Sequence, residues 1–172
     1  MEIRLLDRRD AAAYQALRLQ ALHDSPHAFS ASFEDEAGRS LDEVAARLVP
    51  VADGSVCTFG VFEHGDLAGF VALIHPQRAK LRHSVELAGM YVASAHRCRG
   101  LGRALLQAVI AHARAIDGVR QVGLGVNATN DAAKALYGSA GFASWGVQPR
   151  ALQVDGVFYD EEHQWLCFDT MD

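Results

Sequence analysis

The sequence predicts an α/β fold, because strand-like and helix-like segments alternate along one domain that spans residues 1–172. The clearest evidence is the stretch 85–114. Apolar, β-branched and aromatic residues at 85–92 predict a buried strand, and apolar residues at helical spacing over 101–110 predict a long helix. The next strand-like segment, 120–126, is reached through that helix, so the two strands are expected to be parallel.

The segments before this stretch predict two further helices and three strands. Residues 2–6 have the pattern of a short strand, and 9–23 that of an amphipathic helix. A capping box, Ser-Leu-Asp-Glu, begins a second helix over 40–49. The runs 56–62 and 67–75 are apolar, and the turn residues between them predict a hairpin.

The hairpin continues into the central strand, 83–92, which is its third member. Gly89 lies inside this strand, where glycine often marks a bulge or the close approach of another backbone. A last helix is predicted over 130–140. The final region, 142–169, contains the turn signal Val-Asp-Gly at 154–156 between two strand-like runs, which predicts a second hairpin.

The composition is that of a globular protein, with 50% hydrophobic and 22% charged residues. The net charge of −5 argues against a nucleic-acid partner. No apolar run is long enough for a membrane helix, and the N-terminus lacks the apolar core of a secretory signal. Three separated cysteines and the absence of metal-ligand spacings argue against a disulfide framework and a metal site. We therefore expect a cytoplasmic protein with no metal and no membrane partner.

A basic glycine loop, RCRGLGR at 97–103, joins the central strand to the long helix. The first N–H groups of a helix have no partner inside it and lie at the positive end of its dipole, so they can bind phosphate. Gly100 and Gly102 let the backbone approach such a ligand, and the arginines add cationic donors. The spacing matches neither a nucleoside-triphosphate P-loop nor a complete dinucleotide fingerprint. A glycine-rich turn with solvated arginines explains the loop equally well.

A second motif, Asn-x-x-Ala-x-x-Leu-Tyr-x-x-x-Gly-Phe, occupies residues 130–142. Together with Arg-x-x-Gly-x-Gly after a strand, at 97–102, it resembles the GNAT superfamily of acetyl-CoA-dependent N-acetyltransferases. The resemblance covers about 85–142. It implies a mixed, twisted sheet of about seven strands flanked by helices, with a V-shaped opening for CoA between the fourth and fifth strands. Gly123 and Gly125 stand where many members carry larger residues, so they either widen the cleft or relieve packing.

By the same resemblance, acetyl-CoA is the co-substrate and lies along the exposed backbone of the central strand and the basic loop. The residues expected to bind it are Met90, Tyr91, Val92, Arg97, Cys98, Arg99, Gly100, Leu101, Gly102, Arg103, Asn130 and Tyr137. Asn130 also has the position of a helix N-cap, and both roles can hold at once. Cys98 is interpreted as a variable loop position and not as a nucleophile, because no base partner can be identified for it.

Acetyl transfer needs a polarised thioester carbonyl and a proton for the departing thiolate. Backbone N–H groups beside Gly89, those of Met90 or Tyr91, are the candidates for an oxyanion-type donor. Tyr137 matches the family's general acid, which protonates the sulfur or hydrogen-bonds to it. A phenol with a pKa of about 10 stays protonated at neutral pH. The alternative for Tyr137 is an aromatic residue that packs the last helix against the sheet.

Glu86 is the candidate for the catalytic base. It lies near the position where several relatives carry a carboxylate that removes the amine proton, directly or through water. A carboxylate on a strand is more often a solvent-facing residue in an alternating pattern. His83 and Tyr91 compete for the role, and many members of the family use no dedicated base.

These features predict an acyltransferase that moves acetyl from acetyl-CoA to a primary amine of a small molecule or peptide, by direct attack in a ternary complex. The alternatives are a non-catalytic acyl-CoA-binding or regulatory module, and a nucleotide-binding protein that uses the same glycine loop. Dimers are common in the family, with the C-terminal strands as the candidate contact, so a homodimer stays open.

The identity of the acceptor stays open as well. Phe29, Phe33 and the acidic runs at 34–36 and 160–162 could favour an apolar cation such as a polyamine, an aminoglycoside or a peptide amine. They could equally form a solvated surface. The segment 26–36 is accordingly interpreted either as a packed connecting loop or as part of the acceptor pocket.

Overall fold

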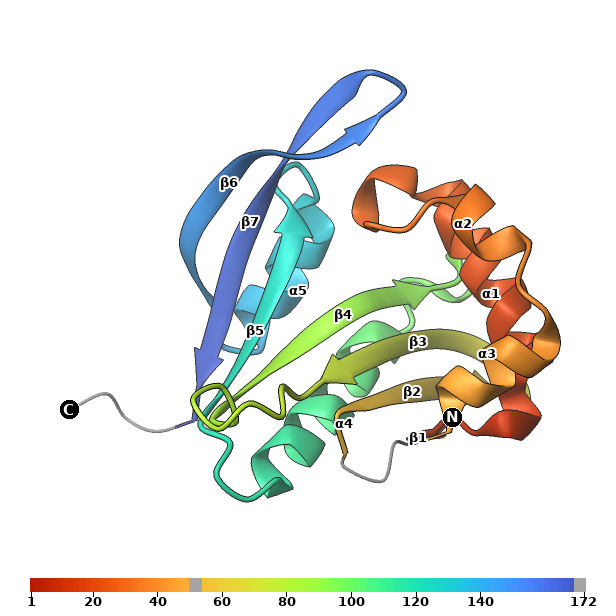
Figure 1. Cartoon of the computed structure of the whole chain (residues 1–172), viewed down its shortest axis with the longest axis horizontal. Coiled ribbons are helices and arrows are strands. Elements are labelled where there is room, and N and C mark those ends of the chain that lie inside the picture. The colour runs from red at the N-terminus through yellow and green to blue at the C-terminus, as the bar shows by residue number, and fades with distance from the viewer. Residues whose placement is uncertain (50–53, 169–172) are drawn as a thin grey trace.

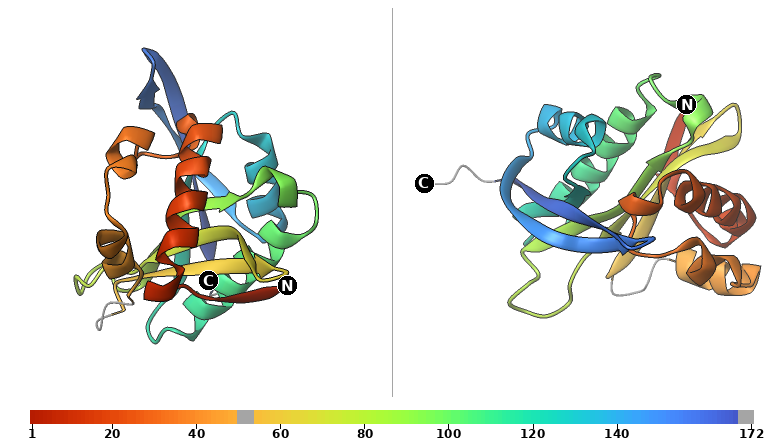
Figure 2. Two further views of the ribbon diagram at one scale, coloured as in Figure 1. Left: turned by 90° about the vertical axis from the view of Figure 1, so that its right-hand side faces the viewer. Right: turned by 90° about the horizontal axis from the view of Figure 1, so that it is seen from above.

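The computed structural model describes residues 1–49 and 54–168. Its centre is one seven-stranded sheet with the strand order β1-β2-β3-β4-β5-β7-β6. Figure 1 shows that helices cover both faces of this sheet, and Figure 2 shows the same layers from two further sides. The β4–β5 pair is parallel and the other pairs are antiparallel, so the predicted mixed sheet flanked by helices is confirmed.

The elements agree with the predicted segments to within a few residues; residue 169, the predicted end of the last hairpin, lies outside the described residues. The strands are β1 (Glu2–Leu5), β2 (Val56–Glu63), β3 (Asp66–Ile74), β4 (Ser84–Val92), β5 (Gln121–Asn127), β6 (Ala143–Val154) and β7 (Val157–Cys167). The helices are α1 (Ala11–Asp24), α2 (Phe33–Ala37), α3 (Leu41–Leu48), α4 (Leu101–Ala115) and α5 (Asp131–Ser139). Short 3-10 turns are η1 (Arg8–Asp10), η2 (Pro26–Ala28) and η3 (Ser94–His96).

The short helix α2 lies where the sequence indicated only a connecting segment, and it explains part of the acidic run. The Ser32 hydroxyl accepts a hydrogen bond from the Asp35 N–H at 3.1 Å, and the Asp35 carboxylate accepts one from the Ser32 N–H at 2.9 Å. This capping box lowers the pKa of Asp35, chiefly through the Ser32 N–H. The next carboxylate, Glu36, pairs with Arg39 at 2.8 Å and Arg47 at 3.3 Å. Two of the three acids therefore stabilise local structure.

The sheet separates two hydrophobic cores. One lies under α4 and α5 and contains Leu105, Val109 and Val122, all fully buried. The other lies under α1 and α3 and contains Leu22 and Phe70. Successive residues of a strand point to opposite faces, so β2, β3 and β4 each contribute residues to both cores, whereas β5 contributes only to the core under α4 and α5. The two faces of β4 consequently belong to two different environments.

The sheet opens between its fourth and fifth strands. β4 and β5 are paired from Ser84 opposite Gln121 to Leu87 opposite Leu124, and the paired register ends there although both strands continue. Just past this point, Gly89 has a left-handed φ of +61°, and the register between β3 and β4 shifts. The predicted bulge and the V-shaped opening are both present. Glycine suits the bulge because a left-handed backbone is strained for other residues.

Gly69 on β3 lies directly beside β4, and a methyl group there has no room. An ideal Cβ on Gly69 would lie 2.7 Å from the backbone oxygen of Tyr91, which can move only if β4 moves. We expect Gly69→Ala to lower the free energy of unfolding by about 1–3 kcal/mol, the usual cost of overpacking, as measured by urea denaturation. Gly38→Ala is the control, because a Cβ there meets nothing within 4 Å. An equal loss in both variants would contradict the packing argument.

Candidate functional site

A cleft of about 650 Å³ lies at the opening between β4 and β5. Its walls come from the second half of β4, the basic loop, the first turns of α4 and α5, and η2. Figure 1 shows how these segments, which are far apart in the sequence, surround the opening. The cleft is lined by all the residues predicted to bind acetyl-CoA except Arg99: Met90, Tyr91, Val92, Arg97, Cys98, Gly100, Leu101, Gly102, Arg103, Asn130 and Tyr137.

The floor of the cleft is the edge of β4 beyond Leu87. The paired register with β5 has ended there, so backbone N–H and C=O groups of β4 on this side are not paired with β5. Backbone polar groups are obligatory hydrogen-bonding groups, and water or a ligand has to satisfy them. The bulge at Gly89 places Met90 at the point where the strands part. This edge can bind an extended ligand that carries amide groups.

Tyr137 reaches the cleft from α5 and is buried, with 9% of its surface exposed. Its hydroxyl donates to the sulfur of Met90 at 3.8 Å, which places the phenol at the β4 bulge. Burial raises the pKa of Tyr137 to about 12, so the hydroxyl keeps its proton at neutral pH. The ring also packs edge-on against Phe142, with the centroids 5.9 Å apart. Packing and proton donation, the two roles considered for Tyr137, are thus compatible in one position.

The basic loop brings a helix N-terminus to the cleft. Cys98 and Gly100 both have left-handed backbones, with φ of +59° and +81°, and Gly100 is the N-cap of α4. Leu101, Gly102 and Arg103, the first turn of α4, line the cleft. The N–H groups of such a first turn have no partner inside the helix and favour an anion. The loop geometry therefore supports the predicted phosphate site.

The three arginines of the loop take different positions. Arg97 lines the cleft, and its Nε donates to the carbonyl oxygen of Val92 at 3.0 Å. Arg103 also lines the cleft. Arg99 instead donates to the Glu63 carboxylate at 2.7 Å, on the β2–β3 side of the loop. Its charge is already paired there, so Arg97 and Arg103 are the cations that the cleft offers to a phosphate.

Two asparagines support the junction between β5 and α5. Asn130 caps α5, because its Oδ1 accepts a hydrogen bond from the Ala133 N–H at 3.1 Å, and it also lines the cleft. Asn127, which the sequence analysis did not single out, is 6% exposed and donates to the carbonyl oxygen of His27 at 3.0 Å. It thereby ties η2 to the end of β5. An asparagine before a helix is common in turns, so its spacing gives no sign of a partner 100 residues away.

Tyr91 lies on the face of β4 that packs against α1, opposite to the face that carries Met90. Its hydroxyl donates to the Asp24 carboxylate at 2.7 Å, and burial raises the pKa of Tyr91 to about 12. The same hydrogen bond lowers the pKa of Asp24. A phenol that is held protonated in this way is unsuited to removing a proton at neutral pH. Tyr91 therefore fits the role of the catalytic base poorly.

Glu86 is an exposed residue of β4 that is not among the residues lining the cleft. Its register partner on β5 is Gly123. Gly123 and Gly125 face the α1 side of the sheet, because the alternate residues of β5 belong to the core under α4. A Cβ on Gly125 would collide with the carboxylate of Glu161 from β7. Gly125 thus makes room for a second carboxylate on this face, whereas a Cβ on Gly123 would meet two backbone oxygens at 4.0 Å, an ordinary contact.

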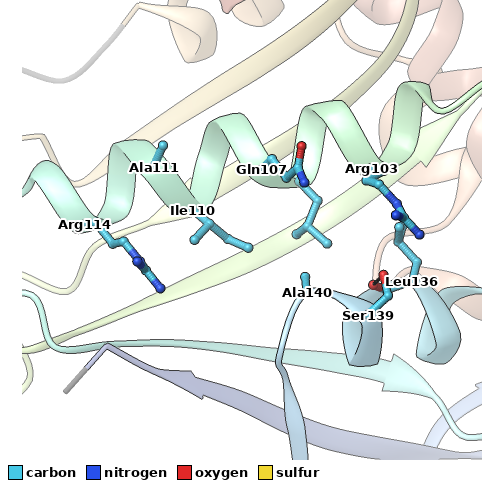
Figure 3. A pocket seen from close by; sticks show the side chains of 9 residues that line it. Arg103, Gln107, Ile110, Ala111, Arg114, Leu136, Ser139 and Ala140 are labelled. Atoms are coloured by element: carbon cyan, nitrogen blue, oxygen red, sulfur yellow. Dashed lines mark hydrogen bonds between the residues drawn. The ribbon is translucent and has the colours of Figure 1, made fainter. Parts of the chain in front are cut away.

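A second hollow, of about 410 Å³, lies between α4 and α5. Figure 3 shows Arg103 and Leu136 at one end of this groove and Arg114 at the other, with Gln107 and Ile110 between them. Arg103 and Leu136 line both the groove and the cleft, so the two hollows adjoin.

Among the described residues, no helix combines the length and the apolar character that crossing a membrane requires. Within the same ranges, 1–49 and 54–168, no group of three or more His, Cys, Asp or Glu side chains is placed to hold a metal ion. Cys57, Cys98 and Cys167 are free thiols.

Known structures share this architecture. An acetyltransferase of the GNAT family from Streptococcus pneumoniae is 27% identical and superposes with a TM-score of 0.86 over 96% of this chain and 98% of that one. A ribosomal-protein-alanine N-acetyltransferase from Brucella melitensis is 25% identical, with a TM-score of 0.84 over 97% and 99% of the two chains. The structure of yncA from Salmonella typhimurium with its cofactor acetyl-CoA is 26% identical, with a TM-score of 0.82 over 100% and 96%.

Of the two sequence comparisons, the one with family profiles agrees with the structural comparison. No curated protein sequence matches this chain significantly. The profile of the acetyltransferase (GNAT) family matches residues 14–142, which is more than half of the chain and includes the glycine loop and Tyr137. The protein therefore belongs to the GNAT acetyltransferase family.

Proposed function

We propose that this protein transfers the acetyl group of acetyl-CoA to a primary amine of a small molecule or peptide, by direct attack in a ternary complex. The observation that carries the proposal is the position of the Tyr137 hydroxyl. It contacts Met90 at the β4 bulge, where pairing with β5 has ended. A protonated donor, an open strand edge and a helix N-terminus thus border one cleft.

The cleft suits acetyl-CoA in its chemistry. The edge of β4 offers backbone groups to the two amides of the pantetheine arm. The first turn of α4, with Arg97 and Arg103, offers N–H and guanidinium donors to the diphosphate. The groove between α4 and α5 begins at Arg103, and we assign it to the nucleotide end of the co-substrate.

In the proposed reaction, the neutral amine nitrogen attacks the thioester carbon and the carbon–sulfur bond breaks. The Met90 N–H is the candidate donor to the carbonyl oxygen as negative charge develops on it. A pKa of about 12 for Tyr137 lies above the roughly 8.5 of a thiol. Because the proton is held more tightly by the phenol, Tyr137 acts by donating a hydrogen bond to the leaving sulfur. The thiolate takes its proton from water after it leaves.

The amine must lose a proton, and we assign its removal to Glu86 acting through water. Glu86 faces the α1 side of β4, the side away from Met90 and Tyr137. An acceptor that enters from this side would meet the carboxylate before it reaches the thioester. The hydrogen bond from the Tyr91 hydroxyl to Asp24 argues against Tyr91 as the base.

Tyr137→Phe tests the sulfur contact. We expect kcat to fall about 100-fold, the usual effect of losing one donor to a developing charge. Acetyl-CoA affinity changes little, because phenylalanine keeps the packing on Phe142. The ratio of the two kcat values stays constant from pH 7 to 10, since a donor with a pKa of about 12 loses its proton only above that range. Thiol release gives kcat, and calorimetry gives the affinity.

If Tyr137→Phe left kcat unchanged, the hydrogen bond from Tyr137 to the sulfur would be contradicted, but the proposed acetyltransferase activity would stand. Wild-type protein that binds acetyl-CoA but acetylates no amine in a broad panel would instead favour the acyl-CoA-binding module. Absence of acetyl-CoA binding would contradict the proposed function altogether.

The arginines of the loop should differ in their effect on acetyl-CoA binding. We expect Arg97→Gln and Arg103→Gln each to raise the Kd about tenfold, because each loses a charge-assisted contact to phosphate. Arg99→Gln raises it much less, because Glu63 already pairs that charge at 2.7 Å. Calorimetric titrations at low and high salt measure the three values. Equal effects of all three substitutions would contradict the assignment from side-chain position.

Glu86→Gln tests the base. We expect kcat/KM at pH 7 to fall about 100-fold, within the usual range for general-base catalysis. The deficit narrows as the pH rises, because the acceptor amine then loses its proton to water. Thiol-release rates across pH measure this. Glu2→Gln, which changes an exposed carboxylate on the edge strand β1, is the control. A deficit that stays constant with pH would contradict the role.

A further inference from the structure

Arg18 occupies an unusual place beside the proposed reaction centre. Its guanidinium carbon lies 4.7 Å from the ring centroid of Phe29 and 6.0 Å from that of Phe70. Its Nη1 lies 3.5 Å from the position that a Cβ on Gly89 would take. The guanidinium of α1 therefore stands against the β4 bulge, on the face opposite Met90 and Tyr137.

Among the described residues, this guanidinium has aromatic neighbours but no carboxylate partner. In the part of the chain that the structure describes, no hydrogen bond or ion pair satisfies Arg18, which is half-buried. The nearby acids of α1 and α2 have other partners. Asp24 accepts a hydrogen bond from the Tyr91 hydroxyl, and Glu36 forms ion pairs with Arg39 and Arg47. A half-buried guanidinium has five N–H donors, and those that the rings cover cannot all be satisfied by water.

The face of the sheet toward α1 also carries carboxylates, at a distance from Arg18 along the sheet. Glu86 lies on β4, and the Glu161 carboxylate lies over Gly125 on β5. The Glu161 carboxylate takes the place that a side chain on Gly125 would need, and a Cβ on Gly123 would meet two backbone oxygens at 4.0 Å. The acceptor side therefore presents a cation from α1 and anions from β4 and β7. This charge pattern is complementary to a molecule that carries both an amine and an acid.

We propose that the acceptor bears a carboxylate, or a similar small oxyanion, close to its primary amine, and that Arg18 binds this group. This inference rests on the proposed function. The flat guanidinium fork binds carboxylates with two parallel hydrogen bonds, which would also orient the amine toward the bulge. A polyamine offers no anion to Arg18 and adds positive charge beside it. An amino acid is the simplest compound of the proposed class.

Matched acceptors test the proposal. The panel consists of triads, each an amino acid, its carboxamide and the corresponding decarboxylated amine, with apolar, aromatic, acidic and basic side chains. Thiol release from acetyl-CoA gives kcat/KM, expressed per neutral amine. We expect at least one amino acid to exceed both of its partners about tenfold or more, because they lack the charged group that Arg18 binds.

Variants of Arg18 separate recognition from packing. We expect Arg18→Gln to raise KM for the preferred amino acid about tenfold or more and to leave the carboxamide and the amine unchanged. Arg18→Lys restores part of the preference, because it keeps the charge but not the fork. Arg8→Gln, an exposed arginine of η1, is the control. If Arg18→Gln does not fold, the kcat/KM values of the wild-type protein across the triads test the proposal without it.

Two results would overturn the inference. Equal kcat/KM values across every triad, or a preference that Arg18→Gln leaves intact, would remove Arg18 from acceptor recognition while turnover still supported the proposed function. If no amine is acetylated, the proposed function fails. Calorimetric titration of amino acids into the complex of the protein with CoA then tests whether Arg18 binds a carboxylate. Saturable binding of an amino acid that Arg18→Gln abolishes would support it, and no binding of any amino acid would overturn it.

Discussion

The rest of the structure depends on one interruption, the end of hydrogen bonding between β4 and β5 at Leu87 and Leu124. Inside a sheet, each strand edge is satisfied by its neighbour, but beyond this point the edge of β4 faces a cleft. A buried backbone group without a partner costs roughly 1–3 kcal/mol. The opening must therefore hold water or a ligand with amide groups. The bulge at Gly89 and the start of α4 can contact a ligand only because this interruption opens a cleft beside them.

The opening is also limited in width by contacts at its far end. Asn127 at the end of β5 donates to the His27 carbonyl, and the His27 ring stacks on Tyr159 of β7 with the centroids 5.3 Å apart. Both contacts join the turn after α1 to the second half of the sheet. The β4–β5 pairs close the opening at one end and η2 ties it at the other. Two strands that merely diverged would lack this second constraint.

Most of the fold was predictable, and all but one of the residues proposed to bind acetyl-CoA line one cleft, because both rest on local signals. Apolar periodicity predicts the elements, and the loop at 97–103 and the motif at 130–142 lie within one short stretch. The prediction for Arg99 shows that such local signals do not determine where a side chain points. Its position in the loop matches a phosphate ligand, yet its side chain turns to Glu63, 36 residues earlier. Loop spacing contains no information about a carboxylate on a neighbouring hairpin.

The acceptor side could not be predicted because its side chains come from segments that lie far apart in the sequence. Arg18, Glu86 and Glu161 come from three separate elements, and no sequence spacing relates them. The co-substrate side is built largely from backbone groups, a helix terminus and a bulge, which require glycines at a few positions. The acceptor side is built from side chains, which can change without altering the backbone. The acceptor can therefore differ between proteins that share this fold, and in the proposed site it is the charge of Arg18, not the sheet, that would favour an acid over a polyamine.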